Sequence, residues 1–137
     1  MSTHRYLRAY LAGVAVPTAF LLVVLTVLML SRSLGRIPGP AERVIVFPMA
    51  MVPNLWGAWN MLYAWLRLRY RIPIGVFGAL LPVIVMPAAV VLSPAIGVDL
   101  PAVAVHVFPV VVVVVTAGYY LLWKYLVRFL NDILEII

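Results

Sequence analysis

Four long runs without a charged residue dominate this 137-residue chain. A helix needs about 20 apolar residues to cross the hydrocarbon layer, which is about 30 Å thick. The chain must be helical there because hydrocarbon offers the backbone no hydrogen-bond partner. The runs are separated only by short connections rich in arginine, proline or glycine. They predict four transmembrane spans, at about residues 10–30, 44–66, 73–96 and 101–123.

Composition and residue patterning agree with a helical membrane protein. Hydrophobic residues make up 66% of the chain and charged residues 10%, whereas charged residues are about a quarter of an ordinary soluble domain. The valine run Val110–Val115 would favour a strand in a soluble protein, but the alternation required of a membrane barrel is absent. We therefore expect an all-α, polytopic integral membrane protein whose residues 1–137 form a single four-helix domain in the lipid bilayer.

The distribution of basic residues predicts how the chain is threaded. With four spans, the N-terminal tail, the second connection and the C-terminal end share one side of the membrane, and together they hold Arg5, Arg8, Arg67, Arg69, Arg71, Lys124 and Arg128. The opposite side has Arg32, Arg36 and Arg43. The positive-inside rule therefore places both termini in the cytoplasm, and a bacterial inner membrane is the expected location.

The third predicted span carries the densest set of prolines. Pro82 and Pro87 fall inside it, and each removes a backbone N–H and obstructs the carbonyl four residues earlier. We expect these prolines to kink the helix. The alternative is that they reflect only the higher frequency of proline in membrane helices.

The second predicted span contains two asparagines, Asn54 and Asn60, beside a stripe of small residues. At 100° per residue they flank the stripe, which consists of Ala50, Gly57 and Ala64, while Trp56 and Trp59 lie on another face. Small residues let membrane helices approach closely, and amides beside such a seam hydrogen-bond across it. We expect the asparagines to join this helix to a neighbour, and we keep Asn54, Asn60, Trp56 and Trp59 as candidate binding residues.

A single histidine near the start of the fourth span is a candidate ligand for a cofactor. His106 follows Asp99 by two helical turns, with Ala102 one turn away. Imidazole binds the metal of porphyrins and chlorins, and an alanine leaves room for a macrocycle. No cofactor is predicted, although a tetrapyrrole or quinone at His106 and Asp99 stays open beside the simpler interpretation of an interfacial histidine hydrogen-bonded to a neighbour.

Residues that would support catalysis are not found together within the spans. The four acidic residues all lie in connections or in the tail, and the chain has no cysteine, no HExxH spacing and no paired carboxylates. We therefore expect no enzyme activity and no metal site. The net charge of +6 is explained by anchors at helix ends, so nucleic-acid binding is not expected.

Beyond the fourth span, residues 124–137 read as a short amphipathic tail that lies on the membrane or docks a partner. Small size and the absence of soluble domains favour a non-catalytic subunit or assembly partner of a larger membrane complex. Two alternatives remain: an oligomeric transporter or channel for small solutes, and a pigment, quinone or lipid binder that uses His106. The expected partners are other membrane subunits or copies of the chain itself.

Overall fold

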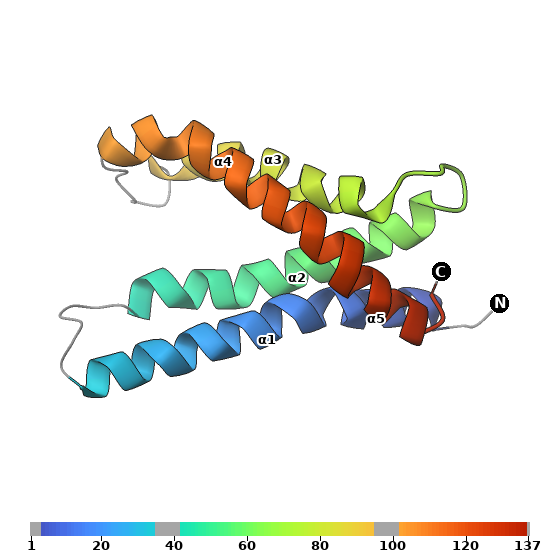
Figure 1. Ribbon diagram of the computed structural model, residues 1–137, viewed down its shortest axis with the longest axis horizontal. Coiled ribbons are helices and arrows are strands. Elements are labelled where there is room, and N and C mark those ends of the chain that lie inside the picture. The colour runs from blue at the N-terminus through green and yellow to red at the C-terminus, as the bar shows by residue number, and fades with distance from the viewer. Residues whose placement is uncertain (1–3, 35–41, 95–101, 137) are drawn as a thin grey trace. The chain divides into compact units, whose positions relative to one another are not determined.

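The computed structural model is all-α and describes residues 4–34, 42–94 and 102–136, with side chains described except at 42–50 and 102–105. Four long helices form: α1 (Arg5–Ser33), α2 (Glu42–Leu66), α3 (Ile74–Leu92) and α4 (Ala102–Leu122). The helix of α4 continues without a break through a π-helical turn, η2 (Trp123–Val127), into α5 (Arg128–Ile133). Figure 1 shows this order along the chain.

Among the described residues, three helical stretches are long and apolar enough to cross a membrane: Arg5–Ser33, Ile74–Leu92 and His106–Ile133. The all-α prediction is confirmed, and all four predicted spans form helices within a few residues of the expected bounds. Pro82 and Pro87 both lie inside α3, which is one α-helix. The kink expected at these prolines stays a prediction.

The contacts of the described residues group them into two compact units, and the expected single domain stays a prediction. Of the described residues, the first unit contains 4–34, 42–69 and 130–136, with α1 packed on α2. The second contains 70–94 and 102–129, with α3 packed on α4 and η2. The C-terminal helix therefore leaves the second unit at Phe129 and contributes its last residues to the first.

Close backbone approach joins α1 to α2 in the first unit (Figure 1). A Cβ atom on Gly13 would lie 2.5 Å from the carbonyl oxygen of Trp56, so only glycine fits there. The ring of Tyr10 covers Gly57, whose added Cβ would lie 2.6 Å from it, and the Tyr10 hydroxyl donates a hydrogen bond to Asn54. The small-residue seam predicted on the second span is thus the packing surface toward α1.

Two glycines on α3 play the same part in the second unit. Added Cβ atoms would lie 2.9 Å from the ring of Tyr120 at Gly75 and 2.0 Å from Cγ of Trp123 at Gly78. Trp123 is fully buried, and its ring lies 6.4 Å from that of Phe77, centroid to centroid. Aromatic side chains one turn apart on α4 and η2 therefore fit onto two glycines one turn apart on α3.

Candidate functional site

A pair of buried amides is the most distinctive polar feature of the first unit. Asn60 of α2 and Asn131 of α5 are both completely buried. The Nδ2 group of Asn60 donates to Oδ1 of Asn131 at 2.7 Å, and Nδ2 of Asn131 donates back to Oδ1 of Asn60 at 3.0 Å. Asn60 Nδ2 also donates to the backbone carbonyl of Ala9 at 2.8 Å. One amide thus joins three helices.

This amide pair is linked to an apolar cluster, because Asn60 donates to the carbonyl of Ala9, which belongs to that cluster. The buried members of the cluster are Ala9, Ala12, Ala64 and Ile136, and the partly buried residues packed against them are Met61, Leu130 and Leu134. An amide in such surroundings costs about 1–3 kcal/mol when it has no partner. Each amide satisfies the other only when the C-terminal segment packs against α2. The amide pair therefore stabilises this packed position of the C-terminal segment.

The backbone of the C-terminal segment ends α5 with a Schellman motif. The N–H of Ile136 donates to the carbonyl of Asn131 at 2.9 Å, and the N–H of Glu135 donates to that of Asp132 at 3.1 Å. Glu135 has φ 52°, the left-handed conformation that this motif requires and that usually selects glycine. Ile136 turns back onto the apolar cluster with Leu130, which completes the motif.

We expect Glu135→Gly to stabilise the protein. Glycine adopts the left-handed conformation without the penalty of about 1–2 kcal/mol that a side chain incurs. The ion pair lost with Glu135 is long, 3.8 Å to Arg8, and the Glu135 side chain is 86% exposed, so the pair contributes less than about 1 kcal/mol. Denaturant titration in mixed micelles should show a gain of about 0.5–1 kcal/mol. Glu135→Val, with a branched side chain at the same φ, should show a loss, and equal stability of the two variants would contradict the role of the turn.

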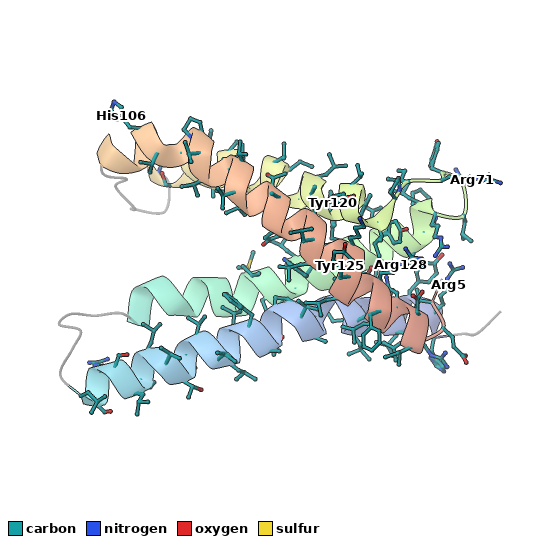
Figure 2. All side chains as sticks on the ribbon, in the orientation of Figure 1. Arg5, Arg71, His106, Tyr120, Tyr125 and Arg128 are labelled. Atoms are coloured by element: carbon teal, nitrogen blue, oxygen red, sulfur yellow. The ribbon has the colours of Figure 1, made fainter. Side chains whose placement is uncertain are left out.

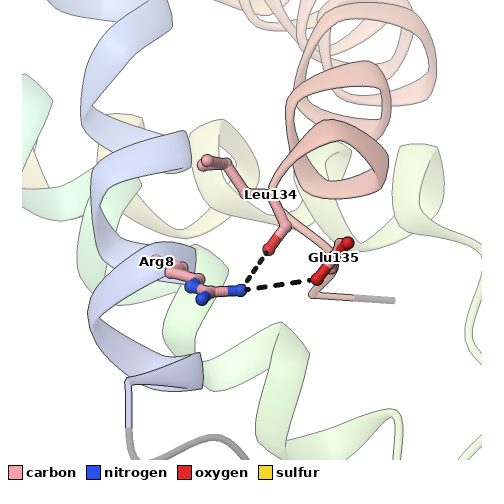
Figure 3. Close-up of polar contacts among 3 residues, drawn as sticks. All are labelled: Arg8, Leu134 and Glu135. Atoms are coloured by element: carbon pink, nitrogen blue, oxygen red, sulfur yellow. Dashed lines mark hydrogen bonds and ion pairs between the residues drawn. The ribbon is translucent and has the colours of Figure 1, made fainter.

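Arginines in the first turn of α1 satisfy carbonyls at the ends of two other helices. Arg5 donates to the carbonyl of Ala64 in the last turn of α2 at 3.4 Å, and Arg8 donates to that of Leu134 at 3.3 Å. Figure 3 shows the guanidinium group of Arg8 in contact with both the carbonyl of Leu134 and the carboxylate of Glu135. The last carbonyls of a helix lack intrahelical partners and carry its negative dipole end, so both contacts are favourable.

The other predicted residues are not members of this cluster. Asn54 is exposed and pairs with Tyr10, while Trp56 is buried and Trp59 is partly buried in α2. His106 is exposed near the start of α4, well away from Tyr120 and Tyr125 along that helix (Figure 2). Asp99, its proposed neighbour, lies outside the described residues. The expectation that the asparagines bond to neighbouring helices is confirmed by their hydrogen bonds.

The hydrogen-bond partner that the sequence did not predict is Asn131. We assigned it to a tail beyond the last span, although a signal was present: Asn131 and Asn60 both lie within seven residues of arginines predicted on the same side. Two amides at similar depth in neighbouring helices are candidates for pairing. The two amides hydrogen-bond to each other, so the cluster holds helices together and offers no polar group for chemistry. Within residues 4–34, 42–94 and 102–136, no three His, Cys, Asp or Glu side chains gather to hold a metal ion.

No family model, curated protein or solved structure matches this chain.

Proposed function

We propose that the protein is a small, non-catalytic integral membrane protein that serves as a subunit or assembly partner of a larger membrane complex. The observation that carries this proposal is where burial stops along the helices. In α1 the buried residues end at Pro17, and in α3 they end at Pro82. The fully buried residues of each helix therefore lie in one half, whereas the other half has only partly buried and exposed residues.

The halves without fully buried residues, here called the open halves, carry large apolar side chains. Phe20 is 67% exposed and Val91 is 77% exposed. Lipid tails are as apolar as these side chains, so membrane helices associate through close packing rather than through the hydrophobic effect. A helix whose fully buried residues lie in one half has little packing energy in reserve, and helices of a partner protein would supply further contacts.

The contacts of Arg8 support four spans with both termini on one side. The start of α1 touches the C-terminal residues Leu134 and Glu135 within one compact unit, and Arg5 touches the last turn of α2. Termini on the same side require an even number of crossings. Three candidate spans are recognised by length and hydropathy, so α2, 25 residues long, would be the fourth. The basic residues of these ends favour the cytoplasmic side.

Native mass spectrometry of the protein purified from its own membranes in mild detergent tests this proposal. We expect a complex of defined mass that contains at least one other polypeptide. A photo-reactive amino acid in place of Phe20, in the open half of α1, should cross-link to that polypeptide. A preparation that contains only monomers would contradict the proposal, and one that contains only homo-oligomers would favour the transporter or channel instead.

A further inference from the structure

Three consecutive side chains in the π-helical turn η2 are exposed. The N–H of Arg128 donates to the carbonyl of Trp123, five residues earlier, which is the hydrogen bond that defines such a turn. Trp123 and Val127 at the two ends of the turn are fully buried, whereas Lys124, Tyr125 and Leu126 between them are exposed. Turns of this kind are frequent at functional sites.

Lys124 is held in place by two aromatic rings. Its Nζ atom lies 5.6 Å from the ring centroid of Tyr120 and 5.4 Å from that of Tyr125. Each contact contributes about 0.5–1 kcal/mol at an exposed site, so the ammonium group has a preferred position. Tyr120 in turn packs on Gly75 of α3, which fixes one side of the arrangement.

The ammonium group has unused capacity for an anion. No carboxylate of the residues with described side chains lies within ion-pair distance of Lys124. Ring faces attract the cation but leave N–H donors free for an oxygen ligand. Arg128 is exposed one turn further along and adds a second positive charge. Figure 2 shows Tyr120, Tyr125 and Arg128 on the same stretch of helix.

Position along the helix identifies the source of the anion. Lys124 is the first charged residue after the uncharged run that starts at Leu100. His106 is the polar residue near the other end of this run, and Lys124 follows it by 18 residues, or about 27 Å of helix. This length is close to the thickness of the hydrocarbon layer, which is about 30 Å. The ammonium group would therefore lie at the level of the lipid phosphates.

We propose that Lys124, held between Tyr120 and Tyr125 on the π-helical turn, binds the phosphate of an anionic phospholipid headgroup. The lipid phosphate would accept hydrogen bonds from the ammonium group, and its acyl chains would follow the exposed apolar surface of α4. A basic residue near the surface of an anionic membrane contributes about 1 kcal/mol to lipid binding. This site is independent of which protein partner the chain has.

Lipid binding by the full-length protein tests the assignment. The protein is transferred from detergent into phosphatidylcholine vesicles with or without phosphatidylglycerol, and retained lipid is counted by native mass spectrometry after mild extraction. We expect Lys124→Gln to bind phosphatidylglycerol about fivefold more weakly than the wild type, the equivalent of about 1 kcal/mol. Lys124→Arg, which keeps the charge, should retain most of the binding and shows that a substitution here leaves the fold intact.

Arg71→Gln is the matched control, because it removes one exposed positive charge that the positive-inside rule places on the same side of the membrane. Equal losses in Lys124→Gln and Arg71→Gln would mean that only overall charge matters and would overturn the site. Inorganic phosphate in place of phosphatidylglycerol distinguishes the source of the anion. We expect inorganic phosphate not to raise the temperature at which the protein unfolds, whereas phosphatidylglycerol should raise it. An equal increase with both would overturn the headgroup assignment.

Discussion

Replacing Gly78 by alanine is expected to destabilise the protein by on the order of 2–3 kcal/mol. The new Cβ atom would lie 2.0 Å from Cγ of Trp123, and the indole cannot move away because it is completely buried. The higher helix propensity of alanine stabilises the protein by at most about 1 kcal/mol. The steric clash is larger, so the net change in the free energy of unfolding is a loss. The free energy of unfolding, measured by SDS titration in mixed micelles, gives the result.

Gly118→Ala is the control for this prediction. Gly118 lies on α4, and a Cβ atom added there would meet nothing within 4 Å. We expect unchanged stability or a gain of up to about 1 kcal/mol. Trimming the indole by Trp123→Leu should cost less in the Gly78→Ala background than in the wild type. If both glycine variants were equally stable, α3 would not be packed on Trp123 through Gly78.

The buried amide pair gives the second large effect. Asn60→Leu and Asn131→Leu should each cost about 1–2 kcal/mol, because each leaves one amide buried without its partner. The double variant should cost clearly less than the sum of the two, with a coupling of about 1 kcal/mol, because it removes both polar groups together. The same SDS titration measures all three variants.

Asn54→Leu serves as the matched control in the same helix. Asn54 is exposed and has Tyr10 as its hydrogen-bond partner in α1, so we expect a loss of only about 0.5 kcal/mol. Additive losses at Asn60 and Asn131 would show that the two amides do not depend on each other. The C-terminal segment would then be held by its apolar contacts alone.

The sequence predicts the helices of this protein well because charge and hydropathy alone determine where a chain leaves lipid. The small-residue seam of α2 was also predictable, since helical periodicity places Gly57 and Ala64 on one face. Hydrogen bonding by Asn60 followed from the cost of burying an amide among apolar residues. These features depend on interactions within a helix or on one face of it.

The sequence could not identify the partners of those faces. Asn131 and Asn60 are 71 residues apart in the chain, and periodicity within a helix says nothing about contacts at such a separation. The π-helical turn was missed as well, because Trp123–Val127 has no residue type that marks it. The candidate site at His106 was proposed with Asp99, which lies outside the described residues, so that pairing stays a prediction.

Labelling of single cysteines in intact, sealed membrane vesicles tests the central claim most directly, because the natural chain contains no cysteine. The account predicts that His4→Cys, Leu68→Cys and Glu135→Cys react with a membrane-impermeant maleimide from the cytoplasmic face, and that Leu34→Cys reacts only from the opposite face. Reaction of His4→Cys and Glu135→Cys from opposite faces would contradict the four-span topology and the contact of Arg8 with the C-terminal segment.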